Sequence, residues 1–343
     1  MQILHYLIEI QNVIDELNKK EYKKILIQLP EGLKHHSLAI KKEINTKNHF
    51  EIFFSGDPCY GACDIPCINQ LNTLGIQAVI QIGHTNIPSL NKRYKEMNMP
   101  IYFVNALSSI DVKPIIRSAC DFFEGKKIGI VTTAQHIHKL HDAIEILSSQ
   151  GFSPIILSGD ERIAEKGQIL GCNFSAAKSS IHSIDSYLFI GSGMFHSLGL
   201  LLSTEKPVII ADPYENKIKK EELIALKERI LRQRFAAITI AKSAKKYGIL
   251  ICSKMGQQRI RLAERIKKTL DALDKESISL VFDSIDPVAL QNYPEIDCYI
   301  STACPRIAID DYTRYKKPII TPVELEIALE KKSFNAYCFD EII

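Results

Sequence analysis

Residues 23–32 read KKILIQLPEG, a pair of lysines followed by a short apolar run that ends at proline and glycine. The same form returns as KKIGIVTT in residues 126–133 and as KKYGILICSKMG in residues 245–256. Short apolar runs bounded by Pro and Gly are typical of buried β-strands. One copy in each third of the chain indicates an internal repeat.

Each copy continues with the same alternation of helix and strand. Residues 37–45, 137–150 and 259–273 have apolar side chains at helical spacing and follow the three opening strands. Alternating helices and short apolar strands predict parallel sheets that are covered on both faces. The further strands expected are residues 50–54, 78–82 and 101–104, then 153–157, 187–190 and 208–211, and finally 278–282, 298–301 and 319–321.

The fold class predicted from this pattern is α/β, with three similar parallel-sheet domains related by internal triplication. A chain of 343 residues is long enough for two or three domains. The predicted domains are residues 1–121, 122–243 and 244–343. Residues 216–246 contain no Pro or Gly and predict a long helical linker between the second and the third domain.

The composition is that of an ordinary soluble globular protein, with 46% hydrophobic and 24% charged residues. A net charge of +3 does not call for nucleic acid as a partner. No apolar run approaches the roughly 18 residues of a membrane-spanning helix, so no membrane segment is expected. The N-terminal stretch of residues 1–19 has charges at helical spacing, which predicts an amphipathic helix, no signal peptide and a cytoplasmic location.

Nine cysteines in a cytoplasmic chain are not expected to form disulfides. Three of them, Cys63, Cys172 and Cys304, lie in compact turn sequences, one in each predicted domain: YGACD, GQILGC and TACPR. In open parallel sheets, loops at the carboxyl ends of the strands gather the binding residues. The three cysteine loops are therefore expected to converge on a cluster site at the centre of the three domains.

Four other cysteines have no such context. Cys252 and Cys298 fall in predicted strands, and Cys120 and Cys338 have no motif around them. A cysteine without a partner usually behaves as a small buried hydrophobic residue, which is the interpretation given to these four.

Three dispersed thiolates suit an iron–sulfur cluster with one open iron better than structural zinc, which prefers a closed set of four ligands. A second metal hypothesis is local, because Cys59, Cys63 and Cys67 form a C-x3-C-x3-C array. The neighbouring prolines break the backbone of that array, and it leaves the loops of the two distant cysteines unexplained. Both hypotheses stay open on the spacing alone.

The motifs together resemble a known family. They are PEGL at residues 30–33, YGACD at 60–64, Gly83-His84, the run from Gly167 to Cys172, and ACPR at 303–306 followed by Asp310-Asp311. In these residues the chain resembles the archaeal radical enzymes of diphthamide synthesis, the 2-(3-amino-3-carboxypropyl)histidine synthases. The resemblance runs through all three thirds of the chain.

This resemblance implies a [4Fe-4S] cluster held by Cys63, Cys172 and Cys304, with S-adenosylmethionine bound to the open iron. It implies cleavage of the bond between sulfur and the γ-carbon, which yields a 3-amino-3-carboxypropyl radical and methylthioadenosine. The radical adds to the imidazole of a histidine in translation elongation factor 2, the first step of diphthamide biosynthesis. A homodimer and a separate electron donor are implied as well. Cys59 and Cys67 lie beyond the family pattern.

Residues that orient the sulfonium substrate would carry the selectivity of this reaction. Arg306 follows a ligand cysteine by two residues and is a candidate clamp for the methionine carboxylate, or a surface arginine that caps the next helix. For each of the other candidate binding residues, the alternative is a purely structural role in a turn or at the end of a helix. They are Glu31, Gly191, Ser192, Gly193 and Gln257.

No catalytic side chain beyond the cluster is required, except that the modified imidazole must lose a proton. Asp310 and Asp311 are candidate bases for that step. The closely spaced His136, His138 and His141 lack the glutamate of a zinc-binding H-E-x-x-H motif and are interpreted as a solvated helix face.

Two other functions fit parts of the pattern. A quinolinate-synthase-like enzyme also combines α/β repeats with three dispersed cysteines and a [4Fe-4S] cluster, but it condenses small acids. A non-metal α/β protein that binds sugars or nucleotides would leave the cysteines incidental. The YGAC and ACPR loops favour the diphthamide family over both.

Overall fold

The computed structural model describes residues 1–343 and is a mixed α/β structure with several parallel sheets. Its contacts divide the chain into two compact units. Unit 1 comprises Met1–Ile169, Ser175–Gly193 and Lys206–Lys219. Unit 2 comprises Leu170–Phe174, Met194–Glu205 and Lys220–Ile343. None of the helices combines the length and the apolar character that crossing a membrane requires.

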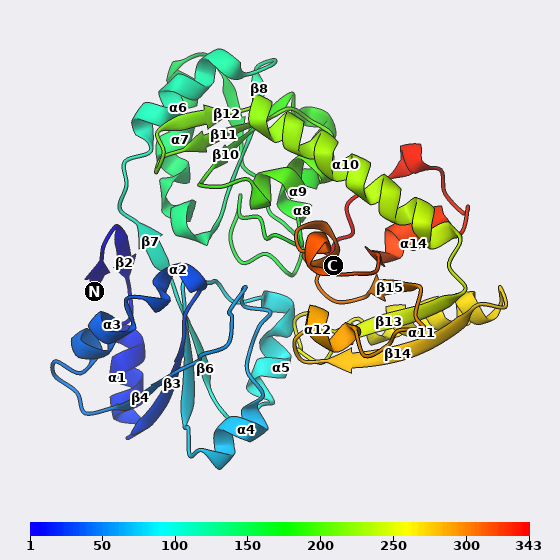
Figure 1. Ribbon diagram of the computed structural model, residues 1–343. Helices are drawn as coiled ribbons and strands as arrows, with labels where there is room; N and C mark the ends of the chain where they lie inside the picture. The colour runs from blue at the N-terminus through cyan, green and yellow to red at the C-terminus, as the bar shows by residue number, and fades with distance from the viewer. The chain divides into compact units, whose positions relative to one another are not determined.

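Unit 1 contains a first sheet of four parallel strands. Its elements are α1 (Gln11–Lys19), β3 (Lys24–Gln28), α2 (Glu31–Lys34), α3 (Ser37–Ile44), β4 (Glu51–Phe54), α4 (Ile68–Thr73), β5 (Ala78–Ile82), α5 (Asn91–Lys95) and β6 (Ile101–Val104). The strand order is β4-β3-β5-β6. Ile25, Ile27 and Ile80 face a buried cluster with α1 and α3, and Figure 1 shows α4 and α5 on the other side of this sheet.

The N-terminal residues differ from the expectation of a helix. They form a small antiparallel sheet with the order β1-β2-β7, made of β1 (Gln2–Ile3), β2 (Tyr6–Ile8) and β7 (Ala106–Ser108). Helix α1 begins only at Gln11. Pairing of β2 with β7 supplies backbone hydrogen bonds that the local sequence pattern does not reveal, so the prediction of a helix from residue 1 was wrong.

Unit 1 also contains a second sheet, of five strands. Its elements are α6 (Lys113–Ala119), β8 (Lys127–Thr132), α7 (Leu140–Ser149), β9 (Ser153–Ile155), α8 (Ser175–Lys178), β10 (Ser186–Ile190), β11 (Val208–Asp212) and β12 (Lys217–Lys219). The order is β12-β11-β10-β8-β9, and only β12 runs antiparallel to its neighbour. The first residues of the predicted linker therefore form an edge strand.

Unit 2 contains the third sheet. Its elements are α9 (Phe195–Thr204), α10 (Glu221–Lys242), β13 (Lys246–Cys252), α11 (Ile260–Asp271), β14 (Glu276–Phe282), α12 (Pro287–Leu290), β15 (Cys298–Ser301), α13 (Arg306–Ile309), β16 (Ile319–Ile320) and α14 (Pro322–Ala328). The four strands are parallel in the order β14-β13-β15-β16. Helix α10 occupies most of the predicted linker.

The three sheets share one strand order. In each, the second strand along the chain lies beside the first, and the third and fourth follow on the other side. This common order is compatible with internal triplication. The division into three domains stays a prediction, since the first two sheets belong to one contact unit and the third to the other.

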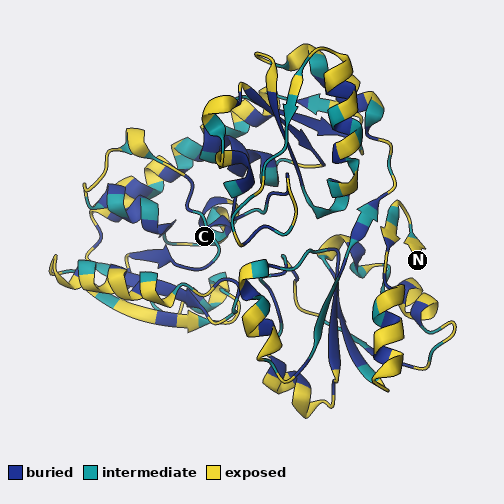
Figure 2. Cartoon of the chain, turned by 180° about the vertical axis from the view of Figure 1, so that it is seen from behind, coloured by how far each residue is buried: buried dark blue, intermediate teal, exposed yellow.

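Figure 2 shows the central strands as buried and the outward faces of the helices as exposed. Cys252 and Cys298 are buried in β13 and β15, as expected for small core residues. Cys120 is partly buried, whereas Cys338 is exposed, so the interpretation of Cys338 as a core residue was wrong.

A buried ion pair ties the helices of unit 2 to its sheet. Arg234 of α10 is 1% exposed and binds both carboxylate oxygens of Glu324 at 2.7 and 2.6 Å. Its Nη1 donates to the carbonyl of Ala308 in α13, and Nη2 also donates to the carbonyl of Ile319 in β16. Glu324 also completes a capping box with Thr321 at the start of α14. One guanidinium therefore links four elements.

Replacing Arg234 by Met would leave a buried carboxylate without its cation. We expect the free energy of unfolding of unit 2 to fall by about 3 to 5 kcal/mol. Urea unfolding followed by circular dichroism measures this, since the chain has no tryptophan. The matched control is Arg232→Met, which removes an exposed pair with Glu228 and should cost less than about 1 kcal/mol. Equal losses for the two variants would contradict the structural role of Arg234.

The three clustered histidines do not share a solvated face. His136, in a 3-10 turn at Ala134–Lys139, is 2% exposed and packs edge-to-face against Tyr214 with ring centroids 5.7 Å apart. His141 is exposed and pairs with Glu145. Burial, followed by the positive charges of His138 and Lys139, lowers the pKa of His136 to about 4. The interpretation as a solvated face was wrong for His136.

The lowered pKa of His136 makes stability depend on pH. Between about pH 6.5 and 4 the unfolded chain binds a proton at this histidine that the folded protein does not, so stability falls as the pH falls. Between pH 7 and pH 5 the free energy of unfolding of the wild type should fall because of His136, and we expect His136→Phe to make this fall smaller by about 2 kcal/mol. Urea unfolding at several pH values tests this. His141→Gln is the exposed control, and parallel pH slopes for wild type and His136→Phe would contradict the prediction.

Candidate functional site

The first predicted ligand, Cys63, lies in the loop between β4 and α4 of unit 1 and is partly buried. The loop closes on itself, because the N–H of Asp64 donates to the carbonyl of Gly61 at 3.0 Å and the N–H of Tyr60 donates to the Asp64 carboxylate at 3.2 Å. A Cβ on Gly61 would stand 3.5 Å from the Sγ of Cys63. Glycine at this position thus leaves room beside the thiol.

Three side chains that the sequence analysis did not identify hold this loop by hydrogen bonds to its main-chain carbonyls. Gln28 donates to the carbonyl of Asp64 at 2.7 Å, Gln81 donates to the carbonyl of Gly61 at 3.2 Å, and Tyr94 donates to the carbonyl of Ala62 at 3.1 Å. The signal in the sequence was that each of two otherwise apolar strands has a glutamine at or near its end. Such residues are rarely buried without a partner.

Cys59 and Cys67 do not join Cys63 in a preformed group. Cys59 is buried, accepts a hydrogen bond from Gln81 at 3.5 Å and lies 3.9 Å from the Nδ1 of His84. Cys67 is exposed and stands at the start of α4. Burial lowers the pKa of His84 to about 4, so its ring is neutral at neutral pH. Within this unit no three His, Cys, Asp or Glu side chains are placed to hold a metal ion.

The second predicted ligand, Cys172, is buried in a short loop of unit 2. The C-terminal segment pairs with this loop. The N–H of Ile342 donates to the carbonyl of Cys172 at 2.9 Å, and Asn173 donates to the carbonyl of Ile342 at 3.0 Å. The N–H of Phe174 donates to the Glu341 carboxylate at 2.8 Å. The last residues of the chain therefore support a candidate ligand, which no sequence motif indicated.

The third predicted ligand, Cys304, lies between β15 and α13 of unit 2. Arg259 holds the preceding residues by donating to the carbonyls of Thr302 and Ala303, both at 2.9 Å. Asp340 pairs with Arg259 at 2.7 Å and so connects this loop to the C-terminal segment as well. Burial, followed by the nearby Cys172, raises the pKa of Cys304 to about 12. The structure thus brings two of the three predicted ligands within electrostatic range of each other.

Arg306 is buried on helix α13 and is not a surface residue. It forms two contacts with the Asp310 carboxylate, at 2.5 and 2.8 Å. Its guanidinium stacks 3.8 Å from the ring centre of Phe195, and Phe339 lies further away at 5.7 Å. The Nη1 of Arg306 is buried and has no hydrogen-bond partner. This nitrogen of the guanidinium is therefore still available to donate a hydrogen bond to a ligand.

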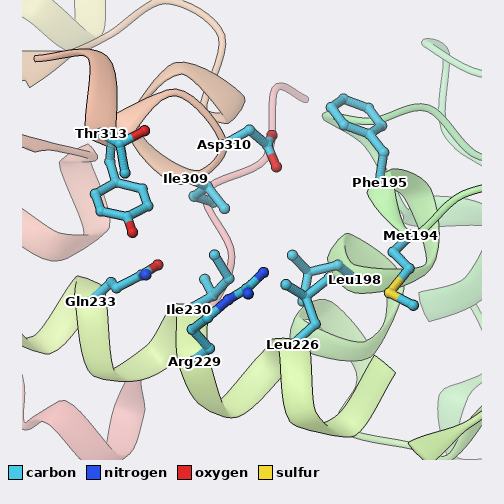
Figure 3. Close-up of a pocket in the computed structure, with 11 residues that line it drawn as sticks. Met194, Phe195, Leu198, Leu226, Arg229, Ile230, Gln233, Ile309, Asp310 and Thr313 are labelled. Carbon is cyan, nitrogen blue, oxygen red and sulfur yellow. The ribbon is translucent and has the colours of Figure 1, made fainter. Parts of the chain in front are cut away.

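A cavity of about 420 Å³ lies in unit 2 beside the ion pair of Arg306 and Asp310. Figure 3 shows Arg229 and Gln233 of α10 on one side, Met194 and Phe195 at the start of α9 on another, and Asp310 among the residues opposite α10. The cavity is lined by Met194, Phe195, Leu198, Leu226, Arg229, Ile230, Gln233, Ile309, Asp310, Tyr312 and Thr313.

The remaining predicted residues are placed as follows. Glu31 is exposed in the first turn of α2 and pairs with Lys34 at 2.7 Å. The Gly191-Ser192-Gly193 turn follows β10, and the Ser192 hydroxyl donates to Asp212 at 3.2 Å. Gln257 is buried in unit 2, and Asp311 pairs with Arg314 at 3.4 Å on the surface. Of the predicted site, unit 1 carries Cys63, Glu31 and the Gly191–Gly193 turn, and unit 2 carries the rest.

The donor set fits a group that is held by thiolates. Each of the three cysteines stands on a short loop whose backbone is fixed by side-chain or main-chain hydrogen bonds, and Cys172 lies close enough to Cys304 in unit 2 to affect its pKa. Thiolate sulfur is the ligand of iron–sulfur clusters, and a rigid backbone around it is what such sites require.

Comparison with known proteins gives consistent matches along most of the chain. A family model described as putative diphthamide synthesis protein matches residues 29–338. The 2-(3-amino-3-carboxypropyl)histidine synthase of Pyrococcus horikoshii is 37% identical over 96% of this chain and 92% of its own length. The enzyme of the same name from Methanocaldococcus jannaschii is 34% identical over 96% of this chain and 90% of its own length.

A solved structure matches as well. The crystal structure of Dph2 from Pyrococcus horikoshii with a 4Fe-4S cluster superposes with a TM-score of 0.86 at 36% identity, covering 98% of this chain and 94% of the other. The matched region contains all three candidate cysteine ligands. Fold, motif positions and sequence similarity agree, and the chain belongs to the diphthamide synthesis protein family.

Proposed function

We propose that this protein is a transferase that moves the 3-amino-3-carboxypropyl group of S-adenosylmethionine to a histidine of translation elongation factor 2. This is the first step of diphthamide biosynthesis, and methylthioadenosine is released. The observation that carries the proposal is a family match over residues 29–338, which contain three cysteines on separately supported loops. Quinolinate-synthase-like chemistry and simple ligand binding lack support of this kind.

The proposed ligands of a [4Fe-4S] cluster are Cys63, Cys172 and Cys304. The similar Pyrococcus horikoshii structure contains such a cluster. Three protein ligands leave one iron open for the substrate. When bound, the reduced cluster would supply the electron that breaks the bond between sulfur and the γ-carbon of S-adenosylmethionine.

The chain's own residues would orient the substrate. Arg306 remains the proposed clamp for the methionine carboxylate, because its Nη1 is a buried donor without a partner while Asp310 fixes the rest of the fork. Phe195 stacks on the guanidinium and limits its movement. Glu31, Gly191, Ser192, Gly193 and Gln257 remain proposed contacts to the amine, ribose or adenine.

No general base is assigned. The two candidates are both engaged, Asp310 with Arg306 and Asp311 with Arg314. The proposed partners are elongation factor 2 as protein substrate, an electron donor and a second copy of this chain in a homodimer, and the proposed location is the cytoplasm.

Anaerobic reconstitution tests the ligand set. We expect about four irons and four sulfides per chain in the wild type, and loss of the intact cluster in Cys63→Ala, Cys172→Ala and Cys304→Ala. Cys67→Ala and Cys59→Ala should retain it. With dithionite and S-adenosylmethionine, the wild type should form methylthioadenosine. Formation of 5′-deoxyadenosine alone, or an iron-free wild type, would contradict the proposed function, and cluster loss in Cys59→Ala and Cys67→Ala would restore the local-array hypothesis.

Arg306→Lys tests the carboxylate clamp. Lysine keeps the positive charge but loses the planar fork, so we expect the affinity for S-adenosylmethionine to fall roughly tenfold or more, with cluster content retained. Calorimetric titration under anaerobic conditions measures the affinity. Arg314→Lys, which alters an exposed pair with Asp311, is the matched control. Unchanged affinity in Arg306→Lys would remove Arg306 from the binding site.

A further inference from the structure

Two glutamines stand at the ends of neighbouring buried strands in unit 1. Gln28 closes β3, Gln81 lies near the end of β5, and the two are directly opposite in the parallel register. They are 2% and 0% exposed. A buried amide is costly unless its hydrogen bonds are made, and leucine would suit the apolar pattern of either strand. Their presence therefore calls for a physical reason.

The loop that carries Cys63 determines the orientation of both amides. The carbonyl of Asp64 can only accept, so the amide nitrogen of Gln28 faces it at 2.7 Å. This leaves the Oε1 of Gln28 to accept from the Nε2 of Gln81 at 2.8 Å. The same Nε2 contacts the carbonyl of Gly61 at 3.2 Å and the Sγ of Cys59 at 3.5 Å. Each amide thus directs its donor group at the loop or at its partner.

Tyr94 of α5 adds a third donor. Its hydroxyl donates to the carbonyl of Ala62 at 3.1 Å. Burial, followed by the neighbouring Cys63, raises the pKa of Tyr94 above its ordinary value, so the hydroxyl keeps its proton. The carbonyls of residues 61, 62 and 64, which flank the thiol on both sides, are therefore all bound by side chains from the sheet and α5.

These contacts fix the peptide planes around the thiol. In a planar trans peptide the C=O and the following N–H point in opposite directions. With the carbonyls of Gly61 and Ala62 directed at the side chains, the N–H groups of Ala62 and Cys63 point to the other side of the loop. Hydrogen bonds near the ligating sulfurs are one of the factors that set the reduction potential of an iron–sulfur cluster.

We propose that Gln28, Gln81 and Tyr94 are positioning residues that hold the Cys63 loop in the geometry in which its thiol binds the cluster. This inference rests on the proposed function for the identity of the bound group. The geometry of the clamp itself is independent of it.

A purely structural role accounts less well for the pair. The Oε1 of Gln81 is buried and has no hydrogen-bond partner. Two apolar side chains at these positions would avoid that cost, as replacing both members of a buried polar pair is often neutral or stabilising. The unpaired Oε1 of Gln81 is a cost to stability, and what the two amides hold is the loop of a candidate ligand.

The test uses Gln81→Met, which keeps the size of the side chain but loses its donors, and Tyr94→Phe, which loses one hydroxyl. In the protein without cluster, residue-resolved alkylation measures the reactivity of Cys63. We expect Gln81→Met to raise its alkylation rate several-fold and Tyr94→Phe to raise it less. In the reconstituted protein, both variants should shift the midpoint potential and the electron paramagnetic resonance spectrum of the cluster.

Asn45→Ala is the matched control, because Asn45 makes two hydrogen bonds to Phe50 beside the same sheet without touching the loop. It should lower stability and leave Cys63 reactivity and the spectrum unchanged. If Cys63 is alkylated at the wild-type rate in both Gln81→Met and Tyr94→Phe, the proposal that these residues hold the loop is overturned, regardless of the potential or the spectrum of the cluster. If the wild type takes up no cluster, the proposed function fails, and the alkylation rates still decide whether the clamp holds the loop.

Discussion

The strand order shared by the three sheets is the constraint on which the candidate site depends. Because the first and third strands of each sheet are neighbours, the loops that leave their carboxyl ends run in opposite directions, which is where open parallel sheets bind their ligands. Each sheet places a polar side chain there. Gln28 and Gln81 do so in the first sheet, Thr132 donates to the carbonyl of Ile190 in the second, and Thr302 donates to the carbonyl of Leu250 in the third.

Two of the cysteine loops are stabilised in the same physical way, although the side chains differ. The Cys63 loop receives its hydrogen bonds from neutral amides and a phenol, and the Cys304 loop receives them from the guanidinium of Arg259. In both, side-chain donors bind main-chain carbonyls next to the thiol. A loop that is held by its carbonyls keeps its cysteine side chain in place.

The sequence predicted the parts of the molecule that depend on local pattern. Apolar runs located the opening strand of each sheet, and the cysteine loops were recognisable because glycine and proline surround them. The clamp of Gln28 and Gln81, the contact of Arg259 with the Cys304 loop, and the support of Cys172 by the C-terminal segment depend on residues far apart in the chain. The N-terminal strands and the burial of His136 escaped prediction for the same reason, since tertiary pairing decides them.

The groups that hold the cysteine loops bring little net charge. The clamp in unit 1 is neutral, and Arg259 and Arg306 are each paired with an aspartate. In such surroundings a thiol favours its protonated form, as the raised pKa of Cys304 shows. Binding of a metal group must then release protons, and the cations of that group balance the charge of the thiolates.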